Sequence, residues 1–297
     1  MSTADRARAP SSMRRRVRPR YLRLALAELW MIASVVLALI PLLLVLGYVI
    51  SRGAHLISWH LLSQPEPYGF TDRNGGLWNG IKGTIKVMVL ASCVGVPIGV
   101  GCALWLNEYG HGWFAATVRF VADVMTGVPS VFVGVFIYSA VVLNTGHFSS
   151  WSGAIALGLL MLPIIVRGCE EVLRLVPDEL REASTALGVP RWRTTLKVVL
   201  PAAKSGIVTV VMLSIARAAG ETAPLLFTSF GNRVVTGWTD LNGPDSALPL
   251  LIFRDARSAY PAAQERAWAG ALVLITMILV LTIVARLVAG RSSRSSR

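Results

Sequence analysis

Charged residues are scarce in this chain. They make up 15% of its 297 residues, whereas a soluble globular protein has about 25%. Hydrophobic residues make up 54% of the sequence. This composition argues against a soluble protein and predicts a chain that crosses a membrane several times.

Cysteine and histidine are also rare. The three cysteines are Cys93, Cys102 and Cys169, and all of them lie in or beside apolar runs. None has the spacing of a metal site or of a CxxC pair, so we predict no redox or metal role. The four histidines fall in predicted loops, at positions 55, 60, 111 and 147.

Sequence signatures of enzymes are missing. There is no GxxxxGK[ST] pattern, so the chain by itself cannot cradle the phosphates of ATP. There is also no HExxH, no nucleophile elbow and no paired-carboxylate arrangement in a soluble domain. We therefore expect a non-catalytic protein with no cofactor of its own.

Acidic residues are fewer than basic ones, 16 against 29, and a net charge of +13 is compatible with nucleic-acid binding. The positions of the basic residues along the chain argue against such binding. Eight arginines lie in residues 1–24, seven Lys or Arg in 167–204 and four in 286–297. Membrane proteins mark their cytoplasmic side in this way. We expect no nucleic-acid partner, and we place both termini and the 167–204 loop in the cytoplasm.

Six apolar runs approach or exceed the roughly 20 residues that cross a bilayer. They cover residues 30–50, 87–106, 124–143, 148–166, 205–227 and 267–285. The predicted fold is an all-α polytopic membrane protein with six spans, and its first partner is the lipid bilayer. Residues 25–290 form the transmembrane domain, with a cytoplasmic loop at about 168–204. A basic tail, 1–24, is expected to be disordered, and 291–297 is a cytoplasmic tail.

Two short features add detail to these spans. Gly95, Gly99 and Gly101 in the second span are small residues that let helices approach closely. The 107–118 segment is expected to be a cytoplasmic loop, because an even number of crossings separates it from the other cytoplasmic segments.

The polar loop itself has the pattern of helix, turn, helix. Asp178 is predicted to cap a helix that begins at Glu179. Gly188 stands just after the expected end of that helix, where a left-handed residue is favoured. Pro190 suits the start of the next helix, because its missing N–H is not needed there.

Charges inside or beside the spans are the candidate functional groups. Arg217 lies about midway along the fifth predicted span, where a charge costs about 2.5–3.5 kcal/mol. Glu221 is four residues on, and Arg167 and Glu170 end the fourth span three residues apart. They could be two structural ion pairs. They could instead line a path for an anion, since the guanidinium fork matches phosphate oxygens.

The polar loop resembles the coupling loop of ATP-binding-cassette importer permeases. That family has Glu-Ala-Ala, three residues, Gly, nine residues and Ile-x-Leu-Pro. The matching residues are Glu182, Ala183, Ser184, Gly188, Val198, Leu200 and Pro201. Ser184 replaces Ala and Val198 replaces Ile, and both changes are small. The resemblance implies a helix that docks into a groove of an ATPase subunit.

Two further stretches narrow the resemblance. Ile215–Leu225, with sequence IARAAGETAPL, and Gly127–Gly134, with sequence GVPSVFVG, look like motifs of the permeases of phosphate-specific importers. The A-type permease of such systems is resembled more closely than the C-type. The resemblance covers roughly residues 25–290. It implies a substrate pathway at Arg167, Glu170 and Arg217, with Glu221 beside it.

The resemblance also implies a set of partners in the bacterial inner membrane. These are a second related permease subunit, two ATP-binding-cassette ATPase subunits that bind ATP and Mg, and an extracytoplasmic phosphate-binding protein. Inorganic phosphate is the implied substrate. The sequence leaves three alternatives open: a permease for sulfate or molybdate, a secondary transporter driven by an ion gradient, and a membrane scaffold.

Overall fold

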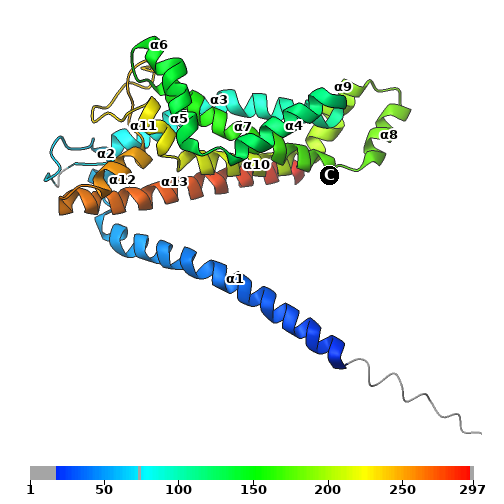
Figure 1. Ribbon diagram of the computed structural model, residues 1–297, viewed down its shortest axis with the longest axis horizontal. Coiled ribbons are helices and arrows are strands. Elements are labelled where there is room, and N and C mark those ends of the chain that lie inside the picture. The colour runs from blue at the N-terminus through cyan, green and yellow to red at the C-terminus, as the bar shows by residue number, and fades with distance from the viewer. Residues whose placement is uncertain (1–17, 73–74, 295–297) are drawn as a thin grey trace, which may run out of the picture. The chain divides into compact units, whose positions relative to one another are not determined.

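The computed structural model describes residues 18–72 and 75–294, and its regular structure is helical throughout these ranges (Figure 1). The long helices are α1 (Arg18–Gly53), α3 (Trp78–Glu108), α4 (Gly112–Gly127), α7 (Ser150–Arg174), α10 (Leu200–Ala219) and α13 (Pro261–Arg294). The short helices are α2 (Trp59–Ser63), α5 (Ser130–Ile137), α6 (Leu143–Thr145), α8 (Asp178–Ala186), α9 (Arg191–Thr194), α11 (Ala223–Thr228) and α12 (Leu248–Ala256). One 3-10 turn, η1 (Ala54–Leu56), and two π-helical turns, η2 (Tyr138–Val142) and η3 (Thr195–Val199), complete the order. The all-α prediction is confirmed.

Membrane-crossing segments agree in number with the prediction. Within the described ranges, five helical segments are long and apolar enough to cross a membrane, and a bent pair brings the count to six. The predicted spans 30–50, 87–106 and 267–285 lie within α1, α3 and α13, and the predicted span 148–166 begins two residues before α7.

The third predicted span, 124–143, was wrong in its bounds and in its shape. The structure has two helical pieces, Gly112–Gly127 and Ser130–Thr145, which meet at an angle of 104°. Pro129 explains the break, because proline has no N–H to donate and disfavours helical backbone at the residue before it. The predicted loop 107–118 shrinks accordingly to three residues between α3 and α4.

The fifth predicted span and the polar loop also need correction. Helix α10 ends at Ala219, and α11 begins at Ala223 after a break. On the other side, α7 continues to Arg174, and helical structure resumes at Arg191 as α9, η3 and α10 in one candidate span. The non-membrane loop is therefore shorter than 168–204 and contains α8.

Small residues bring α3 and α7 together. A Cβ atom on Gly95 would lie 3.4 Å from the backbone of Gly158, and one on Gly99 would lie 2.7 Å from the side chain of Ile165. The close approach predicted for these two glycines is confirmed. Gly101 is different, because nothing lies within 4 Å of the corresponding position.

The chain divides into two units, which are described separately: one contains α1 as far as Ser51, and the other begins at Arg52. In the second unit, α11 and α12 lie at one end and α8 and α9 lie at the other (Figure 1). We refer to these as the α12 end and the α8 end.

Parts of the predicted tails lie outside the described residues. These are 1–17 and 295–297. Residues 18–24 of the predicted disordered tail are the first turns of α1, and 291–294 are the last residues of α13.

Candidate functional site

A cavity of about 260 Å³ lies where the two broken segments of the chain meet. Its wall includes residues 125–130 at the α4–α5 break, four residues of α7 between 160 and 164, and the end of α10. The helices that follow the two breaks, α5 and α11, also pack closely against each other. A Cβ atom on Gly134 would lie 2.6 Å from the Cα atom of Pro224, so only glycine permits this approach of α5 to α11. The two sequence motifs at 127–134 and 215–225 therefore form one site.

Arg217 and Glu221 both line this cavity. Arg217 is not midway along a span, as predicted, but in the last turn of α10. Its side chain is 62% exposed, and its Nε atom lies 3.9 Å from Oε1 of Glu221. An ion pair this long and this exposed contributes little to stability. The guanidinium group therefore keeps donors available for a ligand in the cavity.

Hydroxyl groups supply further polar atoms to the same wall. Thr126 and Ser130 line the cavity from the α4–α5 break, and Ser214 lines it from α10. Ser130 is the first residue of α5, where backbone N–H groups have no partner within the helix. Among the described residues, no group of three or more His, Cys, Asp or Glu side chains could hold a metal ion.

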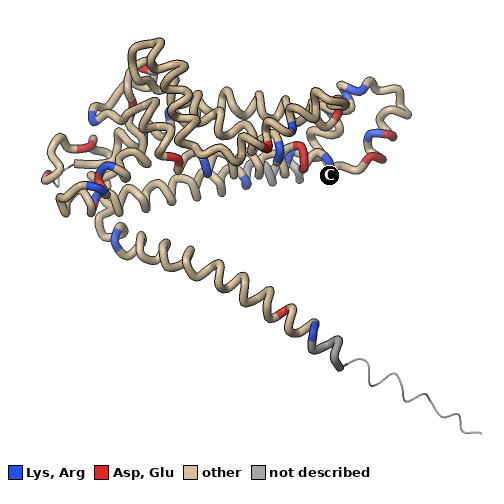
Figure 2. Tube along the Cα trace, viewed as in Figure 1, with Lys and Arg blue, Asp and Glu red and all other residues tan. Residues whose placement is uncertain are grey.

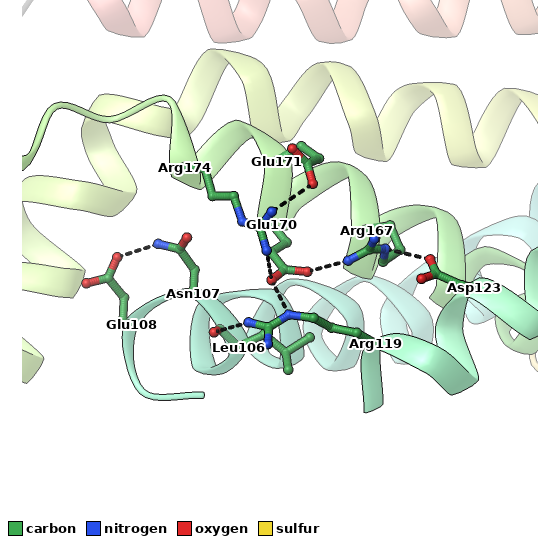
Figure 3. Close-up of polar contacts among 9 residues, drawn as sticks. All are labelled: Leu106, Asn107, Glu108, Arg119, Asp123, Arg167, Glu170, Glu171 and Arg174. Atoms are coloured by element: carbon green, nitrogen blue, oxygen red, sulfur yellow. Dashed lines mark hydrogen bonds and ion pairs between the residues drawn. The ribbon is translucent and has the colours of Figure 1, made fainter. Parts of the chain in front are cut away.

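Arg167 and Glu170 belong to a different cluster of charged residues (Figure 3). The side chain of Glu170 has no exposed surface, and three arginines converge on it. Arg167 contacts it at 2.9 Å, Arg174 at 2.8 Å and Arg119 at 2.6 Å. Arg167 also pairs with Asp123 at 2.7 Å. The cluster ties α7 to α4.

Sequence reasoning missed three members of this cluster: Arg119, Asp123 and Arg174. Arg119 and Asp123 are four residues apart on one face of α4, and Arg174 is four residues beyond Glu170 on α7. This four-residue spacing, which is typical of one face of a helix, was the signal in the sequence that could have identified these residues. It was missed because residues 119–123 fall between the predicted loop 107–118 and the predicted span 124–143, so no helix was predicted across them. Only the carboxylate of the cluster is buried, since the three arginines around Glu170 are 27%, 31% and 49% exposed.

The α8 loop carries the predicted coupling residues. Gly188 has a φ of +73°, which confirms the left-handed position after the helix end. The helix begins at Asp178 and is preceded by Pro177, so the prediction that Asp178 is the cap was wrong. Glu182 and Ala183 are exposed on α8. The third motif residue, Ser184, is buried, and its Oγ lies 2.8 Å from Oγ1 of Thr194.

The end of the coupling motif enters the next helix without a break. Leu200 and Pro201 are the first residues of α10, and the π turn η3 precedes them directly. Pro201 therefore lies inside a continuous helical run, directly after the π turn, where the regular pattern of hydrogen bonds four residues apart is already interrupted.

Comparisons with known proteins give relatives along most of the chain. The phosphate transport system permease protein PstA of Yersinia pestis is 42% identical over 257 residues, which are 86% of each chain. PstA 1 of Mycobacterium tuberculosis is 38% identical over an alignment that covers 97% of this chain and 92% of the relative.

Solved structures show the same fold at low identity. The permease of a bacterial alginate ABC transporter aligns with a TM-score of 0.63 at 13% identity, over 94% of this chain and 98% of its own. The MetNI methionine ABC transporter in an inward-facing conformation aligns with a TM-score of 0.54 at 19% identity, over 75% of this chain and 94% of its own. Residues 95–294 match the family model for the binding-protein-dependent transport system inner membrane component. The chain belongs to this family of ABC importer permeases.

Proposed function

We propose that this chain is the permease subunit of an ATP-driven importer of inorganic phosphate and forms half of its translocation pathway. The observation that carries the proposal is the meeting of the 127–134 and 215–225 motifs around one cavity, with Arg217 in its wall. The relatives named phosphate transport permeases support the same substrate.

The cavity has the donors that a phosphate ion needs. The exposed guanidinium of Arg217 can donate two parallel hydrogen bonds to phosphate oxygens. The hydroxyl of Ser130 stands in the same wall, whereas that of Thr126 donates to the carbonyl of Asp123 at 2.6 Å. Because Arg217 has one loose contact with Glu221, binding an anion would displace little.

Glu221 gives a physical reason to favour phosphate over sulfate. Inorganic phosphate at neutral pH still has a protonated oxygen, because its last proton is lost only at strongly alkaline pH. That group can donate to the Glu221 carboxylate, whereas sulfate has no proton to donate. A site that accepts this hydrogen bond favours phosphate, because sulfate would face the Glu221 carboxylate, which is 20% exposed, with no proton between the two anions.

Coupling to ATP hydrolysis belongs to the α8 loop in this proposal. The exposed residues Glu182 and Ala183 dock on an ATPase subunit, and Gly188 sets the direction in which the chain leaves α8. ATP and Mg bind to the ATPase pair. A second, related permease completes the pathway, and an external phosphate-binding protein delivers the substrate. The spans then rock between inward and outward openings.

Orientation follows from the charge distribution. The α8 end carries the Lys and Arg residues of the loop, so we place it in the cytoplasm of a bacterial inner membrane. With six crossings, both termini lie on that side. The α12 end faces the binding protein.

Uptake of radioactive phosphate by the complete complex in proteoliposomes tests the proposal. Uptake should require ATP and should resist a large excess of sulfate. Arg217→Gln should abolish uptake while the complex still assembles. If the residue only pairs with Glu221, the double variant Arg217→Gln, Glu221→Gln should recover transport, and that recovery would remove Arg217 from the pathway. Uptake without the ATPase subunits would indicate a secondary transporter instead.

A further inference from the structure

Arg181, just before the coupling motif, has every donor of its side chain in use. Its Nε and Nη2 atoms lie 3.3 and 3.1 Å from Oε1 of Glu108, the last residue of α3. Its Nη1 atom donates to Oδ1 of Asp178 at 2.9 Å. A guanidinium group has five N–H bonds, and these contacts occupy three of them.

The remaining two N–H bonds go to the end of α7. Nη1 donates to the carbonyl of Val176 at 2.7 Å, and Nη2 donates to the carbonyl of Leu173 at 3.2 Å. Carbonyls at the end of a helix lack partners within the helix, and a cation is favoured there by the helix dipole. Arg181 thus caps α7, pairs with α3 and belongs to α8, so one side chain joins three helices.

Other connections between α8 and this pair of helices are slight. The chain between α7 and α8 is the short irregular segment Leu175–Pro177. The buried hydroxyl pair of Ser184 and Thr194 links α8 to α9 rather than to α3 or α7. Glu182 and Ala183, on the outer face of α8, are exposed. A force applied to that face therefore passes directly to α3 and α7 through Arg181, and indirectly to α10 through α9 and η3.

We propose that Arg181 is the positioning residue that transmits displacement of α8 to α3 and α7. Helix α7 forms one wall of the Arg217 cavity and carries Glu170, so displacement of α7 changes the shape of the site. The inference rests on the proposed coupling of α8 to an ATPase. Lysine could not replace Arg181, because its ammonium group is a point charge without the planar fork that holds Glu108 and the carbonyls together.

The attachment itself is tested by hydrogen exchange of the assembled complex. Arg181→Ala should raise the exchange rate of the α8 amides by about tenfold or more, because charge-assisted bonds to partly buried groups are lost, while the α7 amides before Glu170 stay protected. Arg181→Lys should fall between wild type and Arg181→Ala. Asp178→Asn is the matched control. It removes only the partner whose side chain is exposed, and its exchange should stay near wild type.

The transmission is tested with the same variants in proteoliposomes. Arg181→Ala and Glu108→Gln should keep basal ATP hydrolysis but lower phosphate uptake per ATP by about tenfold or more. The double variant should be no worse than Arg181→Ala, since both changes break one connection. Unchanged exchange in Arg181→Ala overturns the attachment, whatever the substrate. Normal uptake per ATP, or loss of ATP hydrolysis and uptake by the same factor, overturns the transmission. Failure of the wild type to transport phosphate would instead refute the proposed function.

Discussion

Charged residues lie at both ends of the second unit (Figure 2), but the two ends are held by different kinds of interaction. At the α12 end, Lys86 and Asp245 approach to 2.5 Å, and each side chain is only 4% exposed. Asp255 pairs with Arg266 at 2.7 Å in equally buried surroundings. At the α8 end, Arg181 holds α8 against the body, and the residues that face outward are exposed.

Because its charges are buried, the α12 end resists any partial displacement. Lys86 also donates to Thr236, Gly237 and Asp240, so a loop wraps around its ammonium group. Any movement that separates these groups leaves charge uncompensated in buried surroundings. The α8 end can be displaced at a smaller cost, because water can replace lost contacts there. The comparison indicates that the α12 end is fixed, whereas α8, at the other end, can move.

We expect the largest effect from a substitution that breaks the buried ion pair at the α12 end. Asp245→Ala leaves the buried ammonium of Lys86 without its counter-ion and removes acceptors from Ser150 and Thr236. We expect a loss of about 3–5 kcal/mol, seen as a much lower unfolding temperature in detergent and a reduced amount of protein in the membrane.

Asp240→Ala is the control for this variant. It lies in the same loop, its side chain is exposed, and Lys86 contacts only its backbone carbonyl. We expect a change within about 0.5 kcal/mol. Equal losses in the two variants would show that the loop, and not the buried pair, holds the α12 end.

A smaller effect on stability is expected at the α8 end. Gly188→Val places a β-branched residue at a φ of +73°, which costs roughly 1–3 kcal/mol. The protein should remain inserted, because the strain can be relieved by movement of α8 alone, but phosphate uptake should be lost. Gly188→Asn is the control, since asparagine tolerates left-handed backbone. Normal uptake by Gly188→Val would argue against a role for this turn in coupling.

The smallest effect concerns pH and returns to the α12 end. Burial raises the pKa of Glu66 above 4.5, although Arg254 acts in the opposite direction. A carboxyl group with a raised pKa in the folded state contributes stability that is complete below its unfolded pKa. This contribution is lost as pH rises through its folded pKa. The wild-type unfolding temperature should therefore fall over this window, apart from the effects of other groups.

Glu66→Gln should remove that part of the pH dependence, and a series of unfolding curves from about pH 4 to about pH 8 measures it. Glu179→Gln, an exposed change on α8, is the matched control and should keep the wild-type slope. A wild-type slope in Glu66→Gln would mean that another group is responsible.

Local signals in the sequence predicted their structures well. The apolar runs at 30–50, 87–106, 148–166 and 267–285 form helices, since length and hydrophobicity decide a span. Gly188 was assigned a helix end from its neighbours alone, and its backbone is left-handed.

Contacts between distant residues could not be predicted in this way. Arg119 and Glu170 are 51 positions apart, and Lys86 and Asp245 are farther still, so no periodicity links them. The two helix breaks were missed for another reason. An apolar run containing Pro129 or Gly220 is compatible with a kinked helix as well as with a break, and packing decides between them.

The π turn η3 determines which way Arg217 faces. The N–H of Leu200 bonds to the carbonyl of Thr195, five residues earlier, so this turn holds one residue more than an α turn. Each residue of an α-helix rotates the chain by about 100° and advances it by about 1.5 Å. Deleting one residue from 195–199 would wind the turn into ordinary α-helix and shift the register of α10 against α8 by that amount. The Arg217 guanidinium would then be turned out of its cavity, although no residue near the cavity had changed.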